Sequence, residues 1–205
     1  MNKEDKFVIT ISRQFGTGGH EIGAELARRL GVKLLDKQIL NEVAARMQTV
    51  EDAVEKIESR NPLWRDDFTN FYRTYLVNAE YNGQEQEQTG HTLFQTQADA
   101  IRRIAAEESC VIVGRCGFDI FAEHPNALKI FIHASLDCRK RRIAEKYDIS
   151  EQDAAAMIVD NDFSRELYTK KFTGRDWKDA TNYDISLDVR SFGVNGAVDF
   201  LMKCI

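Results

Sequence analysis

Short apolar runs alternate along the chain with longer stretches in which apolar residues recur at helical spacing. Most of the short runs are apolar throughout and rich in β-branched residues, as in parallel strands buried on both faces. They predict strands at 7–11, 32–36, 109–114, 127–134 and 183–189. The longer stretches predict helices at 21–30, 37–47, 92–108 and 136–147, with Gly31 at a helix C-terminus. This alternation predicts an α/β fold with a doubly wound parallel sheet and right-handed crossovers.

Two segments interrupt the alternation. Residues 49–90 contain several aromatic residues and end in the polar stretch NGQEQEQTG (82–90), which predicts an inserted helical flap with a loop at its tip. Aromatic residues at spacings of three and four fit either a local core or a base-stacking surface. Residues 150–176 begin with SEQD, a variant of the capping box, and continue with alternating charges. This second segment is either a helix with a solvated face or a lid that binds anions.

Composition narrows the classes of function. The chain has 205 residues and is 43% hydrophobic, which suits one domain with a sizeable core. Its net charge of -5 argues against non-specific binding to nucleic acid or to anionic membranes. The start is too polar for a signal peptide, and no apolar run approaches the roughly 20 residues of a membrane span, so the expected location is the cytoplasm. The four cysteines lack CxxC spacing and are expected to be structural thiols.

The stretch SRQFGTGGHEIG, residues 12–23, joins the first predicted strand to the first predicted helix. A glycine-rich turn at a helix N-terminus presents backbone N–H groups and the positive end of the helix dipole to one anion, which suits a phosphate. The stretch lacks the G-x-G-x-x-G spacing of dinucleotide-binding folds and fails the strict P-loop pattern G-x-x-x-x-G-K-[ST]. A tight turn that only packs the helix on the strand is the alternative interpretation.

Several stretches resemble the cytidylate kinase-like family, a branch of the P-loop nucleoside monophosphate kinases. ITISRQFGTGGHEIGAELARRLGVKLLDKQIL (9–40) resembles the family's opening, and VIVGRCGFDIFAEHPNALKIFIHASLDCRKRRIAEK (111–146) its central block. DFSRELY, the single Trp177 and NYDISLDV resemble its lid and last strand. The resemblance implies a P-loop NTPase three-layer sandwich: a five-stranded parallel sheet of adenylate-kinase type, with a helical flap and a lid. The chain would then be a single kinase-like domain, 1–205, with the flap at 49–90 and the lid at 150–176.

The resemblance also implies roles for individual residues. It implies a kinase that transfers the γ-phosphoryl group of ATP to a nucleoside monophosphate, with Mg2+, and such a transfer depends on alignment and positive charge. Arg115 matches the family arginine that binds the acceptor phosphate; a surface arginine at a strand end is the alternative. Arg139 and Arg142 lie three apart on one helix face. Arg165, three residues after Asp162, resembles the lid pair. The predicted catalytic residues are Arg115, Arg139, Arg142 and Arg165.

The glycine-rich turn departs from the family pattern. Gly19 stands where the P-loop lysine is expected, and Glu21 stands where the Ser/Thr that binds Mg2+ is expected. His20, which is only partly protonated at physiological pH, or Arg13 could supply the missing positive charge. Glu21 would have to turn away from the phosphates or hold the metal through water. The residues predicted to bind ATP are Arg13, Gly16, Thr17, Gly18, Gly19, His20 and Glu21, and no metal site made of protein ligands alone is predicted.

The acceptor side departs from the family as well. Asp36 matches the acidic residue after the second strand and forms the predicted substrate site together with Arg115 and Asp162. Cys116 replaces the carboxylate that normally follows the central arginine, so CMP or dCMP is expected only from the family. Two functions stay open: a nucleotide kinase for a monophosphate or related small acceptor, and a non-catalytic nucleotide-binding regulatory protein with a degenerate P-loop. The expected partners are nucleotides, without nucleic acid or membrane, and a homodimer is left open.

Overall fold

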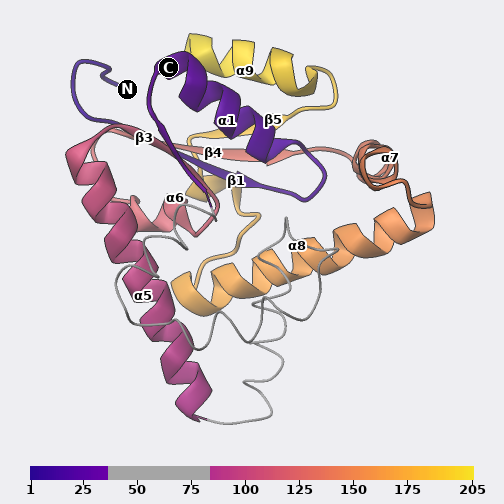
Figure 1. Ribbon diagram of the computed structural model, residues 1–205, viewed down its shortest axis with the longest axis horizontal. Helices are drawn as coiled ribbons and strands as arrows, with labels where there is room; N and C mark the ends of the chain where they lie inside the picture. Colours follow the sequence, from indigo (N-terminus) through magenta and orange to yellow (C-terminus); the bar gives the residue numbers. More distant parts are fainter. Residues whose placement is uncertain (37–83) are drawn as a thin grey trace.

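One parallel sheet carries the fold of the computed structural model, which describes residues 1–36 and 84–205 (Figure 1). Its strands follow the order β2-β3-β1-β4-β5, and every neighbouring pair is parallel. The strands are β1 (Val8–Arg13), β2 (Lys33–Leu35), β3 (Cys110–Val113), β4 (Ala127–His133) and β5 (Ile185–Asp188). All five predicted strands are therefore confirmed, most of them with slightly shorter bounds.

Helices cover both faces of this sheet. They are α1 (Gly19–Leu30), α5 (Gln84–Glu107), α6 (Gly117–Ile120), α7 (Leu136–Tyr147), α8 (Glu151–Thr173) and α9 (Gly193–Cys204), with a short 3-10 helix at Ala180–Asn182. In Figure 1, α1 and α9 lie above the sheet, whereas α5, α6 and α8 lie below it. In the described part of the chain, no helix is long and apolar enough to cross a membrane.

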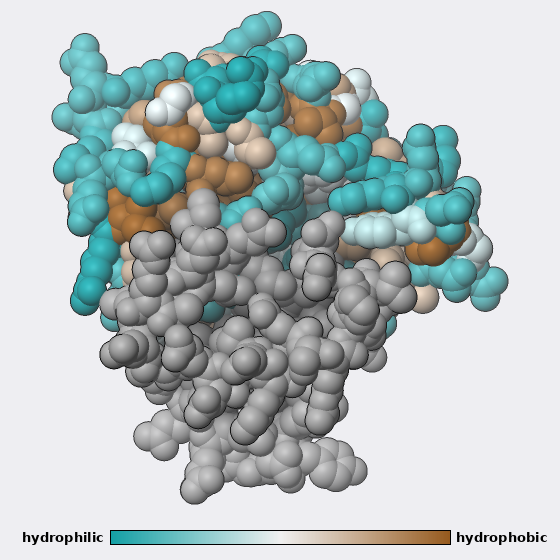
Figure 2. All heavy atoms as spheres, viewed as in Figure 1, coloured by the Kyte–Doolittle hydropathy of each residue, from teal (hydrophilic) through white to brown (hydrophobic). Residues whose placement is uncertain are grey.

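The core has two layers because successive strand side chains point to opposite faces of the sheet. Ile9, Ile11 and Val111 pack with α1 and α9 in one apolar cluster. Val8 and Ile112 pack with α5 and the α6 turn in another. The strands are thus buried on both faces, as their continuous apolar runs predict. Figure 2 shows that the described surface on this side of the molecule is largely hydrophilic, with apolar residues gathered in smaller areas.

Helix ends follow the predicted signals. Gly31 ends α1 in the left-handed conformation, with φ of 67°. Ser150 begins α8, and its hydroxyl accepts a hydrogen bond from the Asp153 backbone N–H at 3.0 Å. The segment predicted to start with a capping box therefore forms one continuous helix over Glu151–Thr173. Whether it moves as a lid stays a prediction.

One sequence prediction, the loop at the tip of the flap, needs correction, and other predictions fall on residues that the structure does not describe. Residues 84–90 belong to α5, so the predicted loop at 82–90 is wrong over that range. Glutamine and glutamate are good helix formers, so the polarity of this stretch did not by itself indicate a loop. The remainder of the predicted flap, 49–83, and the predicted helix at 37–47 lie outside the described residues.

Candidate functional site

The turn between β1 and α1 has the backbone shape of an anion-binding loop. It lies at the carboxyl end of the sheet, where ligands of open α/β sheets bind. Gly16 and Gly18 have φ angles of 82° and 79°, which glycine adopts without a steric penalty. Gly18 is the N-cap of α1 and places no side chain over the first turn of that helix. Thr17 is buried and donates from its hydroxyl to the Gln14 carbonyl at 2.8 Å, which holds the turn closed.

The Arg13 side chain lies directly beside Gly19. A Cβ added to Gly19 would lie 2.7 Å from both Cβ and Cγ of Arg13, closer than real contacts allow. The side-chain stem of Arg13 therefore fills the space that any residue at position 19 would need. Its guanidinium lies against Gly114, at the end of the neighbouring strand β3, where an added Cβ would collide with Nη1.

Asp162 of α8 clamps the turn from the other side. Its Oδ1 accepts a hydrogen bond from the Phe15 backbone N–H at 2.8 Å, and its Oδ2 accepts one from Arg139 Nη1 at 2.5 Å. Arg139 also donates to the Phe15 carbonyl at 3.1 Å. Arg165 Nη1 lies 3.6 Å from Asp162 Oδ1, and its guanidinium lies over the Phe15 ring. Three predicted site residues, Asp162, Arg139 and Arg165, thus meet at Phe15 of the turn.

Two further side-chain contacts border the start of α1. Arg142 of α7 donates to the Glu21 carboxylate, in the first turn of α1. His20 Nε2 lies 4.0 Å from Asp36 Oδ2, just after β2. Arg139 and Arg142, which lie three apart on α7, thus contact Phe15 of the turn and Glu21 at the start of α1, and their catalytic role stays a prediction. Arg141, between these two residues on α7, is exposed.

Arg115 lies in a strained turn after β3. Gly114, Arg115 and Cys116 are consecutive left-handed residues, with φ angles of 84°, 58° and 53°. This conformation is costly for residues other than glycine, and such strained residues recur at functional sites. The turn buries Arg115 to 7% exposure, and Nη1 donates to the Gln97 side-chain carbonyl at 3.2 Å. The alternative of a solvent-exposed arginine at a strand end is wrong.

Cys116 faces α8 from the same turn. Its Sγ lies 3.9 Å from the Thr169 hydroxyl, and burial raises the pKa of the thiol to about 12. It adjoins an aromatic cluster that includes Phe94, Tyr168 and Trp177. A neutral thiol therefore stands where the family resemblance leads one to expect a carboxylate.

Gln97 is a polar site residue that the sequence did not single out. It is 5% exposed on α5, and its side chain contacts Arg115 from a position 18 residues earlier in the chain. One glutamine in an amphipathic helix carries no signal of its own. Only the packing of α5 below the sheet brings it to the end of β3.

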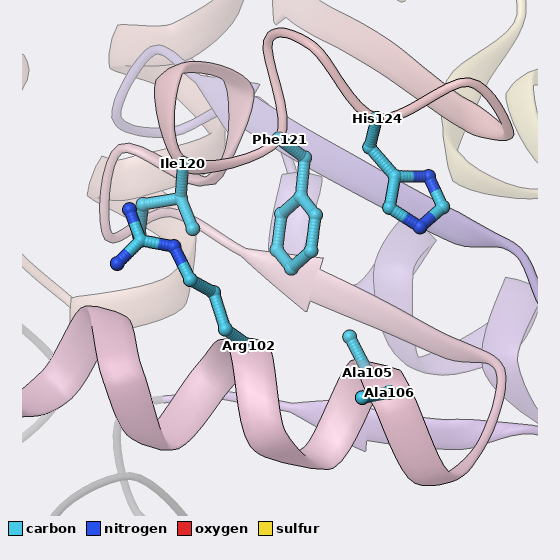
Figure 3. A pocket seen from close by; sticks show the side chains of 6 residues that line it. All are labelled: Arg102, Ala105, Ala106, Ile120, Phe121 and His124. Atoms are coloured by element: carbon cyan, nitrogen blue, oxygen red, sulfur yellow. The ribbon is translucent and has the colours of Figure 1, made fainter.

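The described residues offer no group of three His, Cys, Asp or Glu side chains that could hold a metal ion by themselves. A hollow of about 230 Å³ lies elsewhere, between α5 and the α6–β4 connection (Figure 3). It is lined by Arg102, Ala105, Ala106, Ile120, Phe121 and His124. None of these is a predicted site residue, so this hollow is separate from the glycine-rich turn.

Comparison with known proteins agrees with this architecture. Residues 8–191 match the Cytidylate kinase-like family. A protein named cytidylate kinase from Pyrobaculum aerophilum is 28% identical over 193 residues, which cover 93% of this chain and 88% of that protein. An uncharacterized protein from Eubacterium ventriosum has a similar crystal structure, with a TM-score of 0.73 and 26% identity over 98% of each chain. Shikimate kinase from Bacteroides thetaiotaomicron shares the fold, with a TM-score of 0.51 and 13% identity over 97% of each chain. The match to the family spans nearly the whole length, and the chain belongs to the cytidylate kinase-like family.

Proposed function

We propose that this protein is a nucleotide kinase that transfers the γ-phosphoryl group of ATP to a nucleoside monophosphate or a related small acceptor. The observation that carries the proposal is the convergence of arginines on one glycine-rich turn. Arg13 comes from the end of β1, and Arg139, Arg142 and Arg165 come from helices α7 and α8. Arg115 lies in the turn after the neighbouring strand β3, where it contacts Gln97. Phosphoryl transfer depends on such positive charge and on alignment more than on covalent chemistry of the protein.

ATP would place its phosphates at the N-terminus of α1. The backbone N–H groups of residues 16–20 and the helix dipole favour an anion there. Arg13 supplies the charge of the absent lysine from the end of β1, since its side chain already crosses Gly19. His20 is the less suitable substitute because it lies near the carboxylate of Asp36.

The acceptor would bind on the β3 side, where Arg115 offers a guanidinium that can hold a phosphate with two hydrogen bonds. Asp36 and Asp162 complete the predicted substrate site, although Asp162 also holds the loop backbone. CMP or dCMP is the first choice from the family. The neutral Cys116 thiol leaves the base identity to experiment, because no carboxylate follows the central arginine.

Mg2+ would neutralise phosphate charge in this reaction, and Glu21 is a carboxylate at the turn that could approach it. The arrangement fits a metal that sits mainly on phosphate oxygens and waters, since protein ligands for a separate site are absent from the described residues. The expected setting is the cytoplasm, and free nucleotides suit the net charge of -5 better than nucleic acid does.

A non-catalytic nucleotide-binding regulatory protein is the second candidate, because the lysine and the hydroxyl of the P-loop are both missing. A coupled assay of the purified protein against a panel of nucleoside monophosphates separates the two. The kinase predicts phosphoryl transfer that falls about a hundredfold in Arg115→Ala, with ATP affinity nearly unchanged. Arg141→Ala, an exposed arginine on α7, is the matched control and should retain the rate.

Binding of ATP without transfer to any monophosphate would favour the regulatory protein. Transfer that is fully retained in Arg115→Ala would keep the kinase but place the acceptor elsewhere.

A further inference from the structure

The Glu21–Arg142 ion pair lies directly over Gly18. A Cβ added to Gly18 would lie 2.8 Å from Glu21 Oε2 and 2.9 Å from Arg142 Nη2. Because Gly18 is the N-cap of α1, the pair covers the helix terminus at which we place the phosphates of ATP. A carboxylate of the protein therefore already stands beside the proposed anion site and holds one of its arginines.

Two anions compete for these groups. A phosphate at the start of α1 would be attracted by the helix dipole and by Arg142, as the Glu21 carboxylate is now. The two side chains are 44% and 38% exposed, and partly exposed ion pairs of this kind are weak. A phosphate can therefore readily replace Glu21 as the partner of Arg142. The displaced Glu21 carboxylate would then be repelled by the negative charge of the triphosphate beside it.

A divalent cation removes that repulsion. Mg2+ bound to nucleotide phosphates commonly takes one or two carboxylates in addition to waters. Near the turn, Asp162 has both carboxylate oxygens engaged by Phe15, Arg139 and Arg165. Asp36 lies beyond His20, on the side of β2. Among the described residues, Glu21 is the carboxylate that a Cβ added to the N-cap Gly18 would meet.

We propose that Glu21 is the metal-binding side chain of this site and that it leaves Arg142 for the Mg2+ of the bound nucleotide. Arg142 then turns to the phosphates. This inference rests on the proposed function, and it makes the site selective for the metal complex of ATP over the free nucleotide.

Titration calorimetry of ATP binding, in EDTA and in excess Mg2+, tests the exchange. In the wild type, Mg2+ should tighten ATP binding by about tenfold or more. Glu21→Gln should bind metal-free ATP about fivefold more tightly than the wild type, and its gain from Mg2+ should shrink to about twofold. Glu21→Asp, which keeps a carboxylate, should restore part of the metal effect.

Glu25→Gln is the matched control. Glu25 lies one turn further along α1 and also pairs with arginines, Arg28 and Arg29, but it does not contact the loop. Its titrations should match those of the wild type. If Mg2+ tightens ATP binding as much in Glu21→Gln as in the wild type, or if Glu21→Gln binds metal-free ATP more weakly than the wild type, the proposed role of Glu21 is overturned but the proposed function is not. If neither the wild type nor Glu21→Gln binds ATP in either condition, the proposed function falls and the inference falls with it.

Discussion

Removal of the Asp162 carboxylate should destabilise the protein strongly, because it connects α8 to the glycine-rich turn. Asp162→Ala takes the acceptor from the Phe15 N–H and the partner from Arg139, whose side chain is only 8% exposed. Loss of one member of a buried ion pair costs about 3–5 kcal/mol. Arg139 keeps its hydrogen bond to the Phe15 carbonyl, and alanine is a better helix former than aspartate. We therefore expect a loss of about 3 kcal/mol in the free energy of unfolding.

Asp199→Ala is the matched control for this substitution. Asp199 also lies in a helix, and its Oδ1 is also 2.5 Å from an arginine, Arg29, but its side chain is 60% exposed. An exposed pair contributes about 0–1 kcal/mol. Asp162→Asn should fall between the two, because its amide oxygen can still accept from Phe15.

Urea unfolding of the three variants and the wild type gives the comparison, provided that the m values agree. Hydrogen exchange of the Phe15 amide adds a local measurement, and it should accelerate in Asp162→Ala and stay unchanged in Asp199→Ala. Equal stability of the two alanine variants, with an unchanged Phe15 amide, would refute the clamp.

Four further predictions concern the turn, the acceptor arginine and the buried thiol. Gly18→Ala and Gly31→Ala both replace glycines with positive φ, and each should cost about 1 kcal/mol or more in unfolding experiments. Only Gly18→Ala should abolish ATP binding in a titration, because Gly18 is the N-cap of α1, where we place the phosphates, whereas a Cβ at Gly31 meets nothing within 4 Å. Gln97→Leu removes the buried acceptor of Arg115 and should lower kcat/KM for the monophosphate about tenfold, mainly through KM, in steady-state assays. Burial raises the pKa of Cys116 to about 12, so this thiol should resist a maleimide at pH 8 while the exposed thiol of Cys204, at the end of α9, reacts. Mass spectrometry of the folded protein measures the two labelling rates, and labelling of Cys116 as fast as that of Cys204 would contradict the burial. The same raised pKa contributes stability that is lost as the pH rises above about 9, where the unfolded thiol ionises, and urea unfolding across that range measures the loss.

Local patterns were sufficient for the sheet. The strands are short apolar runs whose neighbours on both faces are helices, so each strand could be recognised without knowledge of its partners. Helix α9 was missed although its signal was present. Val194, Ala197, Val198 and Leu201 have helical spacing, and three of them are buried against α1 and the sheet. Two glycines in the segment obscured the pattern.

The site could be predicted only where the chain order itself brings residues together. The turn, its glycines and the start of α1 are contiguous in sequence. The contact of Asp162 with Phe15 joins positions 147 residues apart, and the contact of Gln97 with Arg115 depends on how α5 packs. The absence of the family lysine at Gly19 was visible in the sequence. The path of the Arg13 side chain beside Gly19 was not, and only the structure provides it.

A crystal structure of the protein with Mg2+ and a bisubstrate analogue, an adenosine linked through phosphates to a second nucleoside, tests the central claim most directly. We expect the phosphates of the ATP half to lie in the turn at the start of α1, within hydrogen-bond distance of the Gly18 and Gly19 backbone N–H groups. Arg13 and Arg142 should contact those phosphates, and Arg115 should contact the phosphate of the acceptor half. Phosphates bound elsewhere, with the turn closed on its own side chains, would contradict the account.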